Sequence, residues 1–316
     1  MATRKAVYFF CRDLDEDPVA SHVFAATLEL FAPREAGFTV DGDPVLVAEG
    51  ADGDSFFYVR TEVVMSHDFK RYLPVLNEHF GDFDFAGLVN WHGGRNAPDE
   101  ILTVHSTGDV STGNYGPVHP VYMRNLLLAL DANRKAAGLE TFRAITEATH
   151  WSGIPYGGQP DLIPLYGVPL VDVEIGSAPS SWSNPHAART VALSLPQVFS
   201  GAELNGRLRT LLCAGGAHLE SSFTAAVTHS SEDRPVAVSH ILPSLWLESG
   251  KYDSVSAVAK VESCVSSIAG GIHAIVLHDD LKGRYKAPFR ALAERLGIPV
   301  FKHKALRQPQ DLPLWD

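Results

Sequence analysis

The chain has 316 residues, of which 45% are hydrophobic and 20% are charged, so it has enough apolar material for a sizeable core. No run approaches 18 consecutive apolar residues, and the opening MATRKAVYFF lacks the features of a secretory signal; a membrane protein is therefore not expected, and a cytoplasmic one is. The formal net charge of -11 argues against a generally basic surface that coats nucleic acid, although a local patch can still bind phosphate.

Short apolar runs alternate with helical patterns along the chain, which is typical of an α/β sheet. The expected strands are AVYFFC, PVLVAE, FFYVR, FDFAGLVNW, ILTVHS, FRAITEA, PLVDVEI, LRTLLCA, VAVSHIL, HAIVLH and IPVFK. The expected helices cover residues 20–31, 120–137, 185–195, 222–228, 254–268 and 285–296. The third helix has a clear start, because Asn184 is a good N-cap and Pro185 suits the first turn.

The order of these elements predicts a mixed, mostly parallel sheet flanked by helices. No repeat, low-complexity tract or linker interrupts the chain, so we expect one α/β domain over residues 1–316, with a smaller lobe as an option. The three cysteines, Cys11, Cys213 and Cys264, lie in apolar segments without CxxC spacing. Neither a disulfide framework nor a cysteine zinc site is indicated, and all three are expected in the core.

Histidines are unusually frequent at the ends of the expected strands. The carboxyl ends of parallel strands line the binding crevice of an open α/β sheet, so these side chains are expected to converge there together with Glu147 and Glu174. Imidazole and carboxylate form the ligand set of catalytic zinc, although no HExxH spacing is present. Alternatively, each histidine is a hydrogen-bonded structural residue and the glutamates pair with Arg143 or Arg189. The histidines are His92, His105, His150, His218, His240 and His278.

The stretch CAGGAHLE, residues 213–220, is a turn of small residues between a strand and a helix. Without a Cβ, Gly215 and Gly216 let backbone N–H groups approach a carboxylate or phosphate closely. The alternative is a tight turn without a ligand.

From Lys282 to Arg307 the chain carries eight basic residues against the single acid Glu294. Such an excess of basic side chains can contact phosphate groups. Alternatively, these side chains form the solvated face of a helix.

Several motifs in order resemble the archaeal and plant-type D-aminoacyl-tRNA deacylases. LTVHSTGD, EATHWSGIP, VDVEIGSAPSSW, CAGGAHLE and VSHILPSLWLE correspond to stretches that read approximately LTVHxxGN, E-[AV]-THHGP, EIGSTEExW, GGGHYAP and GHxxPxY in that family. The resemblance covers roughly residue 88 to the C-terminus. It implies a fold similar to peptidyl-tRNA hydrolase and phosphorylase-like proteins. It also implies a zinc-dependent hydrolase that cleaves the ester between a D-amino acid and tRNA.

The resemblance also implies roles for individual residues. Zinc ligands are expected at His105, His150, Glu174 and His218. Catalytic roles are expected for Glu147, His150, His218 and His240, and a substrate contact for Ser177. From the residues themselves, substrate contacts are also expected at Gly215 and Gly216 of the glycine turn and at Trp151.

Within the motifs the chain departs from the family at Trp151, which replaces a second histidine, and at Ala217. These departures suggest a member recruited to another aminoacyl or small acyl substrate, with Trp151 reshaping the pocket. A phosphorylase or nucleoside-processing enzyme, and a non-catalytic protein that binds tRNA or a small molecule, are the alternatives.

Overall fold

The computed structural model describes residues 3–94, 96–201, 204 and 206–315. The chain forms two compact units, and each is assembled from three segments. The first comprises Met1–Val104, Asn125–Ile145 and Ser152–Ser200, and the second comprises His105–Arg124, Thr146–Trp151 and Gly201–Asp316. Two compact units can belong to one domain, so the expected single domain with a smaller lobe stays a prediction.

The first unit is built on an eight-stranded sheet. Its strands, in spatial order, are β2 (Arg34–Val40), β3 (Asp43–Glu49), β4 (Ser55–Thr61), β1 (Lys5–Cys11), β5 (Phe85–His92), β10 (Leu170–Ser177), β6 (Glu100–Ser106) and β9 (Arg143–Thr146). β1 pairs in parallel with β4 and β5, and β5 pairs in parallel with β10. β3 is antiparallel to both β2 and β4. The predicted mixed, mostly parallel sheet flanked by helices is confirmed.

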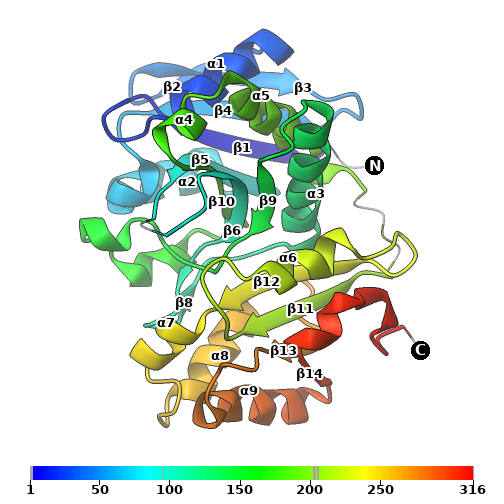
Figure 1. Ribbon diagram of the computed structural model, residues 1–316. Coiled ribbons are helices and arrows are strands. Elements are labelled where there is room, and N and C mark those ends of the chain that lie inside the picture. Colours follow the sequence, from blue (N-terminus) through cyan, green and yellow to red (C-terminus); the bar gives the residue numbers. More distant parts are fainter. Residues whose placement is uncertain (1–2, 95, 202–203, 205, 316) are drawn as a thin grey trace. The chain divides into compact units, whose positions relative to one another are not determined.

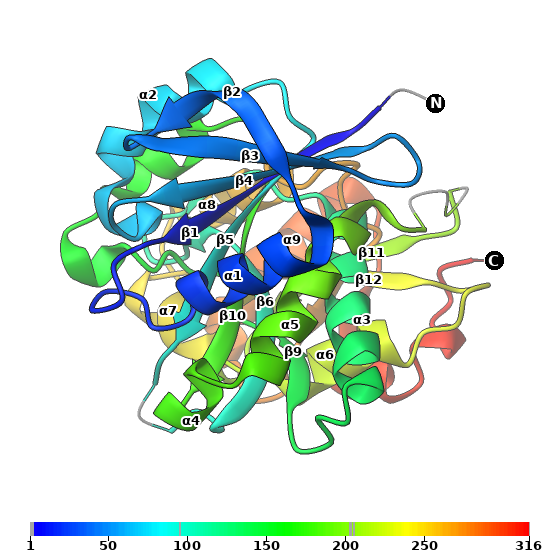
Figure 2. The ribbon, with the colours of Figure 1, turned by 90° about the horizontal axis from the view of Figure 1, so that it is seen from above.

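Alternating side chains of β1 pack on opposite faces of this sheet, as the two-residue period of a strand requires. Phe10 contacts Phe24 of α1 (Ala20–Phe31), with 5.3 Å between ring centroids, whereas Phe9 contacts Phe80, just after α2 (Phe69–His79), at 5.5 Å. Figure 2 shows α1, α5 (Pro185–Ser194) and α3 (Pro120–Ala136) side by side along this sheet. The central strands are therefore covered on both faces, which explains their nearly continuous apolar sequences.

The second unit contains a parallel four-stranded sheet in the order β12 (Val236–Leu242), β11 (Arg209–Ala214), β13 (Ala274–Leu277) and β14 (Val300–Lys302). Helix α6 (Ser221–Thr228) lies on one side of it, and α8 (Ala257–Ser266) and α9 (Gly283–Leu296) lie on the other (Figure 1). The chain order reverses between β11 and β13. Ligands of open α/β sheets bind outside the carboxyl ends of strands at such a switch point, and the turn that carries His218 follows β11 directly.

The remaining elements are short. The second unit also holds the hairpin of β7 (Gly108–Asp109) and β8 (Asn114–Tyr115) and helix α7 (Ser244–Ser249), and the first unit holds helix α4 (Pro179–Trp182). Short 3₁₀ helices occur at η1 (Met65–Asp68), η2 (Ile154–Tyr156), η3 (Pro160–Leu165), η4 (Leu195–Phe199), η5 (His303–Arg307) and η6 (Pro309–Asp311). In the described part of the chain, no helix is both long and apolar enough to span a bilayer.

All eleven expected strands and all six expected helices form, with ends shifted by at most three residues. Strand β2 and helix α2 were not expected. The three cysteines are buried and free, as predicted. The predicted cap of α5 is confirmed, because the Asn184 side chain accepts hydrogen bonds from the backbone N–H groups of His186 and Ala187.

This cap gives a prediction about stability. Replacing Asn184 with alanine removes the acceptor for two N–H groups of the first turn, and we expect the free energy of unfolding to fall by about 1 kcal/mol. Urea unfolding followed by circular dichroism measures the change. Asn184→Asp keeps an acceptor and serves as the control, so an equal loss in both variants would contradict the capping role.

Candidate functional site

The second unit brings together four of the residues predicted from the sequence: His105, Glu147, His150 and His218. His105 is the penultimate residue of β6, Glu147 and His150 follow β9, and His218 lies in the turn after β11.

Backbone hydrogen bonds hold the segment Glu147–His150 on both sides. The Ala148 N–H donates to the His218 carbonyl at 3.0 Å, and the Thr149 N–H donates to the Ile241 carbonyl at 2.9 Å. The His150 carbonyl accepts from the Gly108 N–H at 3.2 Å. Side chains that are distant in the sequence therefore meet in one well-fixed cluster.

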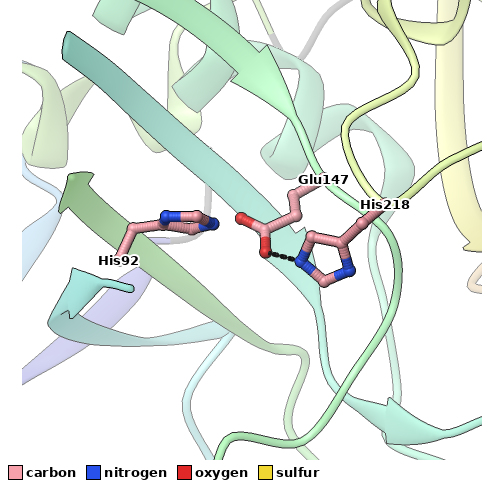
Figure 3. Close-up of side chains that lie close together, drawn as sticks. All are labelled: His92, Glu147 and His218. Atoms are coloured by element: carbon pink, nitrogen blue, oxygen red, sulfur yellow. Dashed lines mark hydrogen bonds and ion pairs between the residues drawn. The ribbon is translucent and has the colours of Figure 1, made fainter. Parts of the chain in front are cut away.

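A hydrogen bond joins Glu147 Oε1 to Nε2 of His218 (Figure 3). Glu147 is 1% exposed, whereas the His218 side chain is 38% exposed. The same carboxylate oxygen lies 3.8 Å from Nδ1 of His150. A buried carboxylate that orients a more exposed imidazole is an arrangement suited to proton transfer.

The imidazoles of His105 and His150 stack, with 3.9 Å between centroids and 24° between ring planes. Each ring donates its Nδ1–H to a backbone carbonyl. His105 donates to the Ser106 carbonyl at 3.1 Å, and His150 donates to the Ala148 carbonyl at 2.9 Å. Burial, reinforced by the imidazoles of His105 and His218, lowers the pKa of His150 to about 3. His150 is therefore neutral at pH 7. A neutral imidazole whose second nitrogen is fixed by a carbonyl is the form that binds metal ions.

His240 lies inside β12 and belongs to a separate hydrogen-bonded network. Its Nδ1 is 2.8 Å from Ser106 Oγ and 3.1 Å from Thr149 Oγ1, and its Nε2 donates to Ser267 Oγ at 2.9 Å. Ser267 Oγ is the acceptor here because it donates its own proton to the Cys264 carbonyl. Both ring nitrogens are thus used in tethering, which favours a structural role; the predicted catalytic role stays a prediction.

Gly215 and Gly216 adopt left-handed φ values of 93° and 81°, so glycine is needed at both positions. Their N–H groups are already used, by the Leu242 carbonyl at 2.8 Å and by Oδ1 of Asp280 at 3.0 Å. This arrangement favours the alternative of a tight turn over the predicted anion cradle. Asp280 also contacts Nδ1 of His278 at 2.6 Å, so a carboxylate of the chain itself occupies the place proposed for a ligand.

The first unit holds the other predicted residues on β10. Glu174, 4% exposed, accepts a hydrogen bond from Thr103 Oγ1 at 3.2 Å. Ser177 Oγ lies 2.7 Å from Nδ1 of His92, the last residue of β5. The roles of Glu174 as a metal ligand and of Ser177 in substrate binding stay predictions.

Trp151, in the second unit, is only 2% exposed. Little of its indole surface can therefore meet a ligand directly, and its predicted substrate contact also stays a prediction.

Sequence reasoning missed Trp246, which lies beside the cluster, and Asp280, which binds the Gly216 N–H in the turn that carries His218. The Trp246 ring centroid lies 5.2 Å from that of His218 and 5.9 Å from that of His150. Asp280 could have been identified from the sequence, because it closely follows His278, at the end of a predicted strand, in LHDD. Trp246 carries no comparable signal.

Half of the basic residues between Lys282 and Arg307 are paired with acids. Lys282 pairs with Glu248 at 2.8 Å and Lys304 with Asp279 at 2.8 Å. Arg284 and Arg295 pair with Asp253 and Glu262. This pairing reduces the excess charge available to phosphate.

Comparison with known proteins identifies the family. A family model described as D-aminoacyl-tRNA deacylase matches residues 79–301, which is more than half of the chain. The chain belongs to this family. The resemblance inferred from the sequence motifs is thereby confirmed.

Two curated relatives, both described as D-aminoacyl-tRNA deacylases, show how far the similarity extends. The protein of Natronomonas pharaonis is 26% identical over 273 residues, which cover 84% of this chain and 56% of the relative. The protein of Haloarcula marismortui is 28% identical over 169 residues, which cover 51% of this chain and 34% of the relative. The chain thus spans about half the length, or less, of the curated relatives that it matches.

A crystal structure described as a conserved protein of unknown function shares the fold. It matches with a TM-score of 0.72 and 18% sequence identity over 98% of both chains.

The tether formed by His240 predicts a pH dependence of stability. Burial lowers the pKa of His240 to about 3, so between pH 6.5 and 3 the unfolded chain takes up a proton there and the folded chain does not. The free energy of unfolding should fall with decreasing pH in this window, by up to about 1.4 kcal/mol per pH unit from this group. His240→Gln should lower stability at pH 7 but flatten this slope. Urea unfolding at several pH values from 7 to 4 measures this dependence in both proteins. Equal slopes of unfolding free energy against pH in the wild type and in His240→Gln would contradict a buried neutral imidazole.

Proposed function

We propose that this chain hydrolyses the ester that joins a D-amino acid to tRNA. Family membership supports this reaction class, and the observation that carries it is the bonded pair of Glu147 and His218 beside the stacked imidazoles of His105 and His150. An ester is already activated toward attack by water, so the chain needs a proton acceptor and a means of stabilising negative charge.

Glu147 and His218 serve in this proposal as the proton-transfer pair. His218 is the more exposed partner and takes a proton from the attacking water, while buried Glu147 holds the ring in place. The same imidazole then returns the proton to the ribose oxygen that leaves. A cysteine nucleophile is disfavoured, because burial raises the thiol pKa of Cys213 and Cys264 well above its usual range and that of Cys11 to about 12.

Zinc is part of the proposal. The imidazoles of His105 and His150, each fixed through Nδ1, fit the donor chemistry of a zinc site. Glu174 and His218 are the further ligands that the sequence predicts, although the bond from Nε2 of His218 to Glu147 favours proton transfer for this ring. A bound zinc ion would lower the pKa of water to about 7 and polarise the ester carbonyl.

The substrate and its location complete the proposal. Aminoacyl-tRNA is present in the cytoplasm, and phosphate contacts would fall to exposed basic residues of the C-terminal segment such as Arg290, Lys302 and Arg307. A member recruited to a small acyl ester would use the same four residues. Comparing rates on tRNA esters and on small D-amino acid esters distinguishes the two substrates.

Removing the proton-transfer pair should abolish most of the activity. We expect Glu147→Gln and His218→Asn each to lower kcat on D-aminoacyl-tRNA by about 10²- to 10⁴-fold, with a smaller effect on KM. His229→Asn is the matched control, because His229 is exposed at the end of α6. Release of radiolabelled D-amino acid, with the L-aminoacyl ester in parallel, provides the measurement. Full activity in both variants would refute the assignment.

Metal content tests the zinc proposal separately. We expect the purified protein to contain zinc by plasma mass spectrometry, and His105→Ala and His150→Ala to lose most of it because each removes a ligand. His240→Gln should keep its metal, since both nitrogens of His240 are engaged elsewhere. Metal-free protein with full activity after treatment with a chelator would contradict the proposal.

A further inference from the structure

Helix α7 places an indole ring directly against the imidazole cluster. The Trp246 ring meets that of His218 edge to face, with 84° between the planes, and lies tilted by 46° against that of His150. The Trp246 side chain is partly buried and packs against the apolar core of the second unit. Trp246 therefore forms a wall of the site without being enclosed by it.

The wall has two properties of a ligand-binding surface. Within the ranges that the structure describes, the indole N–H of Trp246 has no acceptor, and it is not among the buried polar atoms. The neighbouring side chain, Leu245, is 74% exposed. The site is thus bordered by a flat apolar surface with one available donor, and such a surface can stack with a planar group.

Trp246 is fixed to the same turn that carries His218. At the start of α7, the Ser244 N–H donates to the Gly216 carbonyl at 3.1 Å, and Ser244 Oγ donates to Oδ1 of Asp280 at 3.2 Å. Asp280 also accepts the Gly216 N–H. The indole and the proton-transfer imidazole therefore have a fixed spacing, as a site requires when it binds one part of a substrate and reacts with another.

We propose that Trp246 is the stacking platform for the adenine base of the 3′-terminal adenosine of the substrate. This inference rests on the proposed function. Every aminoacyl-tRNA carries its ester on that nucleoside, so a single ribose separates the scissile bond from the base. A rigid indole suits this invariant planar group better than amino acid side chains of differing shape, and base stacking on an aromatic ring contributes substantial binding energy.

The test compares two esters of the same D-amino acid, one with adenosine and one with ethanol. Trp246→Ala should raise KM for the adenosine ester about 5- to 150-fold and lower kcat/KM for the ethyl ester by a much smaller factor. Trp246→Phe should retain most of the affinity because it keeps an aromatic face. Trp315→Ala is the matched control, since Trp315 contacts Arg209 and Arg234 outside the cluster.

The other outcomes are equally informative. Equal losses on both esters would overturn the proposal, because the indole would then support the imidazoles or bind the amino acid; no loss on either would overturn it as well. If the wild-type protein cleaves neither ester, titration with adenosine followed by NMR decides the inference on its own, and the proposed function fails only if D-aminoacyl-tRNA is not cleaved either. Binding that Trp246→Ala abolishes supports the platform, whereas unchanged or undetectable binding to the wild type refutes it.

Discussion

The arrangement of the site depends on the burial of one carboxylate, that of Glu147. Removing a charged group from water is costly unless a well-placed partner compensates, and here the partner is the imidazole of His218. Backbone hydrogen bonds from Ala148 to the His218 carbonyl and from Thr149 to β12 hold the two side chains where this bond can form. The backbone hydrogen bonds and the bond between the Glu147 and His218 side chains thus hold the same segments together. The stacked rings of His105 and His150 belong to these segments as well.

The sequence was sufficient for most of the fold because the central strands are covered on both faces and their apolar runs are unmistakable. It failed where local patterns are weak. Helix α2 has Pro74 in its interior, and an internal proline is typical of a loop or a helix end rather than of a continuous helix. Strand β2 lies at the edge of its sheet, with charged residues and Gly37 at a left-handed φ, so it has few of the features of a buried strand.

For the site, the sequence was informative where polar residues interrupt apolar runs, as at His105, Glu147 and His150. It could not show which partner each group would take. The N–H of Gly216 is used by a carboxylate 64 positions later, and His240 is tethered by residues 106, 149 and 267. Such pairings arise from tertiary contacts. Trp246 escaped notice for the same reason, since an indole beside two imidazoles is visible only after the chain has folded.

The second unit is discontinuous, and this has a consequence for dissecting the protein. A fragment beginning at residue 201 would contain His218 and Trp246 but would lack His105, Glu147 and His150. These three residues belong to two earlier segments of the second unit, His105–Arg124 and Thr146–Trp151. The cluster therefore cannot be transferred on one continuous segment of the chain, and recombination within this family would have to exchange three stretches together to keep it intact.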